Sequence, residues 1–391
     1  MREFGIASIV LLLALSSISG PGERTTHRLS ESMDIAPDST RPIQERLRVM
    51  SYNAFLRPAP VGWGDKNECR AERIARRLSE QPIPRDIIVL NETFDKKATR
   101  RLAELAEERF PYQALGLPEA RGFRTNGGLS ILSRYPIEKW SAERFSRCSG
   151  EFNDCLATKG ILWALVRVSK DLKVNIVATH MNSGHRDSSK RAREHQLDEI
   201  REFIDSQHQT KRWPTLLMGD LNINGMRYEP RYEATNELTE YAQSMALLGN
   251  SCAACETAAC YASCNPVPVD AFRKQIGAWS FEAETTRHVN THNCLGQVME
   301  PCTSPNDDAN WETRSRLDYV MHFGSPKLSP QLDVRVAGAS AQPYRDNACG
   351  TNFLSDHKAV EATIEFRRDV SLNAQMSAPD ADTSRREPSE R

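Results

Sequence analysis

The chain has 391 residues, of which 51 are Lys or Arg and 52 are Asp or Glu, so its net charge is −1 at pH 7. Proteins that bind nucleic acid through phosphate contacts usually carry an overall excess of basic residues or a local basic stripe. The near-equal numbers of basic and acidic residues exclude an overall basic excess in this chain. The length is within reach of one catalytic domain built on two sheets.

The N-terminus predicts export. Arg2 precedes an apolar run from Ile6 to Leu15, and small residues follow as far as Gly20. This pattern is typical of a secretory signal peptide over residues 1–20, and a retained membrane anchor is the alternative. Residues 21–46 are rich in Ser, Thr, Pro and charge and predict a flexible linker.

Six segments further along the chain read as strands, and each delivers or carries a polar group. In chain order they are 47–51 with Asn53, 86–90 with Glu92, 174–179 with His180, 214–218 with Asp220 and Asn222, 316–321 with Asp318, and 359–364 preceded by Asp356 and His357. One such group alone would be explained by a turn or a strand cap. Six groups of one chemical set predict a shared site, because catalytic groups are commonly held where strands end.

Amphipathic helices are predicted between these strands, at 69–78, 98–110 and 195–204. Helices interleaved with strands predict an α+β fold. The first helix carries the densest basic cluster, which we place on its exposed side as a solvated face rather than a nucleic-acid contact; its members are Arg70, Arg73, Arg76 and Arg77.

Ten cysteines in an exported chain predict disulfide bonds. Cys148 and Cys155 are close enough in sequence to close a small loop, whereas the spacing assigns no partner to Cys69 or Cys349. Six more fall in a predicted insertion over 249–314: Cys252, Cys255, Cys260, Cys264, Cys294 and Cys302. A Cys-x-x-Cys start with His288 and His292 nearby leaves zinc ligation as the alternative there.

The ordered set of motifs resembles a known superfamily. Asn, Glu, Thr-His, Gly-Asp-x-Asn, Leu-Asp-Tyr and Ser-Asp-His follow one another as in the endonuclease/exonuclease/phosphatase superfamily, which has the DNase I-like fold. The resemblance runs from about Leu47 to Phe366. It implies a four-layer α/β/β/α sandwich with a catalytic domain over 47–366, followed by a disordered tail over 367–391.

Within that superfamily the chain is similar to the secreted bacterial neutral sphingomyelinases. The motifs that carry this likeness are Tyr52-Asn53 with Trp63-Gly64, Leu90 to Asp95, Asn126 to Leu129 with Ser133 to Ile137, and Thr158-Lys159-Gly160. The resemblance implies a secreted monomer that cleaves sphingomyelin to ceramide and phosphocholine at a membrane surface. The alternatives are a secreted DNase-like nuclease or other phosphoesterase, and a non-catalytic binding module or toxin subunit.

The resemblance also implies roles for the polar groups. Glu92, supported by Asp356, would bind a hard cation such as Mg²⁺, or another divalent cation such as Mn²⁺ or Co²⁺. His357 would be the general base and Asp318 would orient it. The remaining groups would contact the phosphate and the attacking water: Asn53, His180, Asp220 and Asn222.

Several family features are missing or unplaced. The segment Ala337 to Phe353 offers only Tyr344 and Phe353 for insertion into a bilayer, and Lys96 stands where some relatives have an Asn at a second, edge metal site. We therefore expect no edge metal. A choline group needs an aromatic face, and the candidates are Trp63, Trp279 and Trp311. Lys159 begins either a loop linked to activity in relatives or a strand-initiating turn.

Overall fold

The computed structural model describes residues 42–80, 84–116, 125–225, 240–249, 268–271, 286–287, 314–324, 331–350 and 353–368. The chain divides into two units, Met1–Ala36 and Pro37–Arg391, and every described residue belongs to the second. The predicted signal peptide lies outside the described residues, as do most of the cysteine-rich insertion and all of the predicted tail after Arg368.

The first of two six-stranded sheets has the order β13-β14-β1-β2-β4-β3. Its strands are β1 (Ile43–Leu56), β2 (Ile87–Thr93), β3 (Tyr112–Leu115), β4 (Ser130–Ser133), β13 (Asp333–Gln342) and β14 (Ala359–Arg368). β1 runs parallel to β2 and antiparallel to β14. The carboxyl ends of β1 and β2 therefore lie at the same edge as the start of β14.

The second sheet has the order β5-β6-β7-β8-β12-β9. Its strands are β5 (Ile137–Arg144), β6 (Gly160–Arg167), β7 (Lys173–His180), β8 (Thr215–Asp220), β9 (Val269–Asp270) and β12 (Asp318–His322). β10 (Thr286–Arg287) and β11 (Arg314–Ser315) form a separate two-stranded pair.

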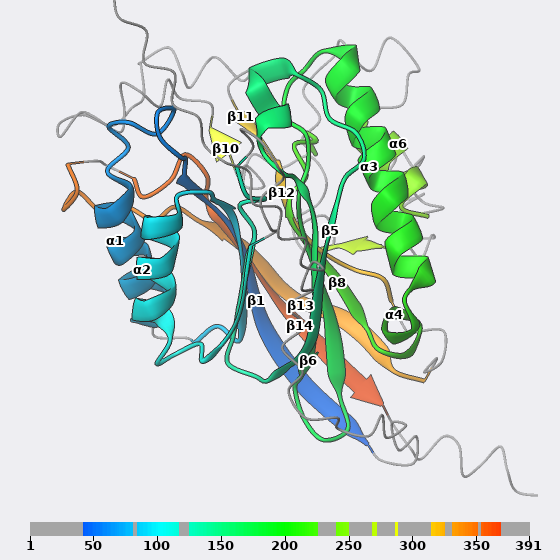
Figure 1. Cartoon of the computed structure of the whole chain (residues 1–391). Coiled ribbons are helices and arrows are strands. Elements are labelled where there is room, and N and C mark those ends of the chain that lie inside the picture. The colour runs from blue at the N-terminus through cyan, green and yellow to red at the C-terminus, as the bar shows by residue number, and fades with distance from the viewer. Residues whose placement is uncertain are drawn as a thin grey trace, which may run out of the picture. The chain divides into compact units, whose positions relative to one another are not determined.

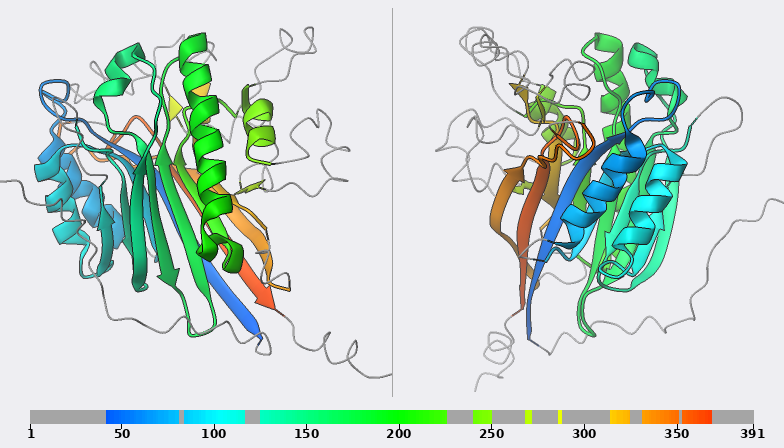
Figure 2. Two further views of the ribbon diagram at one scale, coloured as in Figure 1. Left: turned by 45° about the vertical axis from the view of Figure 1, so that its right-hand side comes forward. Right: turned by 90° about the vertical axis from the view of Figure 1, so that its left-hand side faces the viewer.

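The sheets pack against each other, and helices cover both outer faces (Figures 1 and 2). Val49 and Val89 of the first sheet share an apolar core with Leu162 and Met218 of the second. The helices are α1 (Asn67–Ser79) and α2 (Lys96–Ala106) on the first sheet, and α3 (Asp187–Ser206), α4 (His208–Arg212) and α6 (Glu240–Leu247) on the second. The predicted four-layer α/β/β/α sandwich is confirmed.

β1 is buried on both faces, which differs from the half-buried strand that its alternation suggests. Leu47 and Val49 enter the core between the sheets, whereas Met50 and Tyr52 pack on the side of α1 and α2. A strand covered on both sides has few exposed polar positions. β1 also begins at Ile43, inside the predicted linker, because it pairs with β14 from that residue onward.

All six predicted strands are present, and the three predicted helices are present with shifted ends. α2 ends at Ala106 rather than near 110, and α3 begins at Asp187 rather than near 195. Within the described part of the chain, no helix is long and apolar enough to cross a membrane.

Candidate active site

Strand register brings three site residues of the second sheet side by side. Asp220, the last residue of β8, pairs with His180 of β7 in parallel register and with Asp318 of β12 in antiparallel register. Residues directly opposite on neighbouring strands share a face of the sheet. All three are buried, so the pairing of β7, β8 and β12 concentrates polar groups at one edge.

Asn53 joins this group to the first sheet. Its Nδ2 atom donates to Oε1 of Glu92 at 3.0 Å and to Oδ2 of Asp220 at 3.1 Å. A second link between the sheets runs from Nδ2 of Asn91 to the carbonyl oxygen of Thr179, at 2.7 Å. The site therefore lies where the two sheets meet.

Two site residues adopt a backbone conformation that side chains rarely take. Glu92 has φ 55° and Asn222 has φ 54°, both in the left-handed region. Strain of this kind costs about 1–3 kcal/mol per residue and is found most often at functional sites. Asn222 also donates from Nδ2 to the carbonyl oxygen of Met181 at 2.9 Å, which ties the turn after β8 to the segment after β7.

Gly219 is required by the close approach of β7. Its φ is 147°, and a Cβ atom built there would lie 1.9 Å from the carbonyl oxygen of Thr179. Glycine therefore lets β8 deliver Asp220 directly beside β7.

His357 and Asp318 form a buried pair. Nδ1 of His357 lies 2.7 Å from Oδ2 of Asp318, and Nε2 lies 3.8 Å from Oδ2 of Asp220. Ser355 helps to place the imidazole: its hydroxyl donates to the carbonyl oxygen of Asn53 at 2.6 Å and accepts from the backbone N–H of His357 at 3.1 Å. The second ring nitrogen therefore faces the centre of the site.

Burial and neighbouring charges shift the pKa values of the site. Burial works to lower the pKa of His357, but Asp318, Asp356 and Asp220 outweigh it and raise the pKa well above its ordinary value. Burial and the charge of Asp318 raise the pKa of Asp220 to about 7. Burial and the charge of Asp356 raise the pKa of Glu92. Perturbed groups gathered in one place are typical of catalytic sites.

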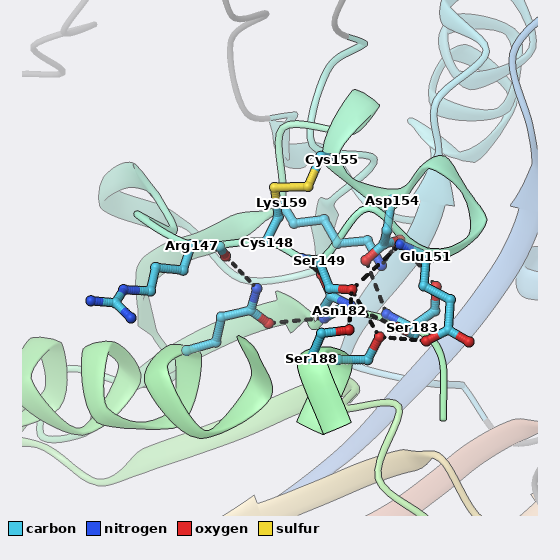
Figure 3. Close-up of a disulfide and its surroundings, with 12 residues drawn as sticks. Arg147, Cys148, Ser149, Glu151, Asp154, Cys155, Lys159, Asn182, Ser183 and Ser188 are labelled. Atoms are coloured by element: carbon cyan, nitrogen blue, oxygen red, sulfur yellow. Dashed lines mark hydrogen bonds and ion pairs between the residues drawn. A yellow bond between two sulfur atoms is a disulfide. The ribbon is translucent and has the colours of Figure 1, made fainter. Parts of the chain in front are cut away.

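Lys159 is buried beside His180 and was absent from the predicted site. Its ammonium group is an ion-pair partner of Asp154 at 2.7 Å, donates to the carbonyl oxygen of Met181 at 2.7 Å and lies 3.2 Å from Nε2 of His180. Figure 3 shows Lys159 and Asp154 beside the Cys148–Cys155 loop. Burial, then the charges of Lys159 and His357, lower the pKa of His180 well below its ordinary value.

Because an ammonium group only donates, Nε2 of a neutral His180 accepts from Lys159 and the ring proton sits on Nδ1. Nδ1 is buried and makes no hydrogen bond to the described residues. The tautomer of His180 is therefore set by Lys159.

Two groups of side chains can be considered as cation ligands. Asp220, Asp318 and His357 offer ligand atoms within 4.8 Å of one another, but His357 already shares a hydrogen bond with Asp318. Glu92 and Asp356 are the predicted cation ligands. Burial first and the charge of Asp356 second raise the pKa of Glu92, and a hard cation bound by oxygen ligands would relieve the repulsion between the two carboxylates.

The predicted exposed basic cluster is wrong for Arg70. This side chain is fully buried, although it belongs to the amphipathic helix α1. Arg73 is partly buried and forms an ion pair with Asp346 at 2.6 Å, whereas Arg76 and Arg77 are exposed. The cluster is therefore split, which further weakens a nucleic-acid contact on this helix.

Both disulfides of the described residues involve cysteines discussed above. Cys148 bonds Cys155, as predicted, and Cys69 bonds Cys349 across a sequence separation of 280 residues. The six cysteines of the insertion lie outside the described residues, and so do His288 and His292. The choice between disulfides and zinc there stays a prediction.

The aromatic candidates differ in exposure. Trp63 is 78% exposed, Tyr344 is buried and Phe353 is half-buried. Trp279 and Trp311 lie outside the described residues. The segment before Ser355 thus offers no fully exposed aromatic side chain among the residues that the structure describes.

Comparisons with known proteins agree with the predicted superfamily. The family described as Endonuclease/Exonuclease/phosphatase family matches residues 50–357. A Sphingomyelinase C of Leptospira interrogans is 32% identical over 232 residues, which is 53% of this chain but only 40% of the relative. A Sphingomyelinase C of Bacillus cereus is 25% identical over 342 residues, covering 83% of this chain and 90% of the relative.

Solved structures share the fold at low identity. Sphingomyelinase C from Streptomyces griseocarneus has a TM-score of 0.53 and 21% identity, covering 83% of this chain and 100% of its own. A variant of Staphylococcus aureus beta toxin with bound magnesium ions has a TM-score of 0.53 and 20% identity, covering 81% and 99%. D. rerio TDP2 complexed with single-strand DNA product has a TM-score of 0.52 and 16% identity, covering 82% and 99%. The fold alone therefore does not choose between lipid and nucleic-acid substrates.

Proposed function

Because the chain belongs to the endonuclease/exonuclease/phosphatase family, we propose that it is a metal-dependent phosphodiesterase that hydrolyses sphingomyelin to ceramide and phosphocholine. The observation that carries the reaction type is the buried His357–Asp318 pair, in which the second ring nitrogen, Nε2, lies 3.8 Å from Oδ2 of Asp220. The substrate class is supported by the Bacillus cereus relative, which aligns along 90% of its length.

In this proposal His357 takes a proton from the attacking water. Nδ1 of the neutral ring donates to Asp318, so the lone pair that accepts the proton is on Nε2, and Asp318 stabilises the imidazolium that forms. Asp220 would hold the same water, since its Oδ2 atom lies 3.8 Å from Nε2. The water oxygen bonds to phosphorus, the bond from phosphorus to the ceramide oxygen breaks, and the departing oxygen takes up one proton, which balances the proton that His357 removed from water. Asn222 keeps the turn of Asp220 in place.

We assign cation binding to Glu92 and Asp356, with Asn53 beside them through its 3.0 Å hydrogen bond to Glu92. When bound, Mg²⁺ or a similar divalent cation would supply positive charge to the phosphoryl oxygens and the departing oxygen. The carboxylates would hold the cation, and the amide of Asn53 keeps Glu92 and Asp220 at a fixed separation.

His180 and Lys159 would stabilise negative charge that develops on the phosphoryl group. Lys159 carries the positive charge, whereas the lowered pKa keeps His180 neutral. His180 can therefore donate only through Nδ1, and Lys159 is the nearer source of charge. Preorganised donors of this kind stabilise a transition state without having to reorganise.

The lipid substrate also requires contact with a membrane. The loop between β1 and α1 presents Trp63 and Val61, which are 78% and 55% exposed, and it follows the strand that carries Asn53. A paired Arg57 and Asp65 hold this loop in shape at 2.9 Å. Tryptophan favours the interface between lipid and water, so we assign this loop to peripheral membrane contact and keep choline recognition by Trp63 as a separate possibility for testing.

Two disulfides support secretion, because disulfides persist in oxidising compartments. We therefore keep the proposal of an exported monomer with a cleaved segment over 1–20. The catalytic domain is proposed to span 43–368, since β1 and β14 pair over that range.

The test is a substrate panel. The purified protein is incubated with sphingomyelin vesicles, phosphatidylcholine vesicles and duplex DNA, each with Mg²⁺ and with EDTA. We expect Mg²⁺-dependent release of phosphocholine from sphingomyelin. Cleavage of DNA alone would replace this proposal with the nuclease alternative, and no cleavage of any substrate would favour the non-catalytic one.

A further inference from the structure

Backbone carbonyl groups converge on the buried side chain of Arg70. Nε donates to the carbonyl oxygen of Leu354 at 3.0 Å, Nη1 to that of Phe55 at 2.8 Å and Nη2 to that of Ala54 at 2.8 Å. Nη2 also contacts Leu354, and the carbonyl oxygen of Asp65 lies 3.5 Å from Nη1. A single guanidinium thus supplies the hydrogen bonds that buried carbonyl groups of three segments would otherwise need from water.

Two of these three segments carry site residues. Ala54 and Phe55 directly follow Asn53 in β1, and Leu354 directly precedes the Ser355-Asp356-His357 motif. Arg70 and Leu354 are 284 positions apart in the chain. Arg70 therefore connects the end of the strand that carries Asn53 with the loop that carries His357.

Arginine is suited to this task in a way that lysine is not. The guanidinium is planar, always charged and carries five N–H donors in a fixed fork, whereas lysine has one nitrogen on a flexible stem. Moving a charge out of water is costly unless its donors are satisfied. The buried charge of Arg70 also lies within the electrostatic influence of Asp356 and Asp65.

Other contacts also hold the loop before His357, but they involve residues farther from His357 in the sequence. The Cys69–Cys349 disulfide and the 2.6 Å ion pair of Arg73 with Asp346 attach α1 to residues before Leu354. These links can retain the loop on the helix. Neither the disulfide nor the Arg73 ion pair reaches the backbone of β1. Of these three contacts, only that of Arg70 connects the loop with β1.

We propose that Arg70 is a positioning residue of the active site, and that its guanidinium fixes the separation between Asn53 and the Asp356–His357 pair. The inference rests on the proposed function for its kinetic consequences. A shift of about 1 Å in such a separation can reduce turnover on the order of 100-fold. The cation site should weaken as well, because Asp356 lies on the loop that Arg70 contacts and Asn53 of β1 positions Glu92 through its hydrogen bond.

The test compares Arg70→Ala and Arg70→Lys with Arg73→Ala, a matched change on the same helix that removes the ion pair with Asp346. Turnover is measured on sphingomyelin vesicles, Mg²⁺ affinity by calorimetry without substrate, and folding by circular dichroism. We expect both Arg70 variants to lose turnover about 100-fold with a smaller change in KM, and to bind Mg²⁺ about 10-fold more weakly. Arg73→Ala should stay near the wild-type values.

Chemical rescue separates positioning from general stability. Ethylguanidinium should restore turnover of Arg70→Ala but not of His357→Ala. Wild-type turnover and Mg²⁺ affinity in either folded Arg70 variant would overturn the inference. So would equal losses in Arg73→Ala without rescue. If Arg70→Ala does not fold, Arg70→Lys decides alone. If the wild type cleaves no sphingomyelin, the proposed function fails and Mg²⁺ affinity still tests Arg70.

Discussion

Asp220 and Asp318 lie directly opposite each other on β8 and β12, and both are buried. Two carboxylates on one face of a sheet repel when both are charged, and burial adds to the cost. The pKa of Asp220 is accordingly raised to about 7, by burial first and Asp318 second. This arrangement costs stability when both carboxylates are charged, and we propose that it is kept because both groups serve the reaction.

Asp220→Asn should therefore stabilise the fold while abolishing activity. Because the folded pKa is raised from 3.8 to about 7, ionising Asp220 lowers stability progressively across that range. The stability gain of the variant should be absent below pH 3.8, grow as the pH rises and level off above about pH 7. Urea unfolding at several pH values in EDTA measures this. A variant less stable than wild type at pH 8 would contradict it.

Glu92→Gln should remove cation binding and nearly all activity, and leave folding intact. A neutral amide cannot supply the charge that a hard cation requires. Since the pKa of Glu92 is raised, wild-type Mg²⁺ affinity should fall as the pH drops, at values where an ordinary glutamate is still ionised. Calorimetry measures both effects. Glu68→Gln, an exposed change on α1, is the control, and Mg²⁺-dependent activity in Glu92→Gln would refute the assignment.

The His357–Asp318 pair should act as a unit. His357→Ala should reduce turnover by about 10³-fold or more, Asp318→Asn should cost less, and the double variant should resemble His357→Ala. Asp318→Asn should also move the acid limb of the rate profile to lower pH, because Asp318 raises the pKa of His357. Fully additive losses would mean that water is activated elsewhere, with His180 the first group to examine.

Much of this site could be predicted from the sequence, because the end of a strand is marked by residues that are neighbours in the chain. Alternating apolar residues before Asn53, and continuous apolar runs before Glu92 and Asp220, are enough to place these groups at a sheet edge. The backbone contacts of Arg70 could not be predicted from the sequence. Helical periodicity reports which face of α1 is apolar, and it cannot report carbonyl groups supplied by Leu354, far along the chain.

Pairing between cysteines that are distant in the sequence could not be predicted from it either. Cys148 and Cys155 lie in one short loop, whereas Cys69 and Cys349 meet only because α1 packs beside the loop before His357. Non-reducing peptide mapping should recover both bonds. Recovery of Cys69 or Cys349 as a free thiol would contradict the fold at this point.

Trp63→Ala should weaken binding to vesicles and lower the rate on bilayer substrate. The rate on a short-chain soluble substrate should stay near wild type, because the site residues are unchanged. Trp140→Ala, an exposed change within β5, is the control and should bind vesicles normally. Vesicle sedimentation and both assays measure this. An equal loss on the soluble substrate would instead assign Trp63 to the headgroup site.

Hydrolysis in water labelled with ¹⁸O tests the central claim most directly. If water activated by His357 attacks phosphorus, mass spectrometry should find one labelled oxygen in phosphocholine and none in ceramide. The reaction should require Mg²⁺ and disappear in His357→Ala. Label in ceramide, or undiminished labelling of phosphocholine by His357→Ala, would contradict the account.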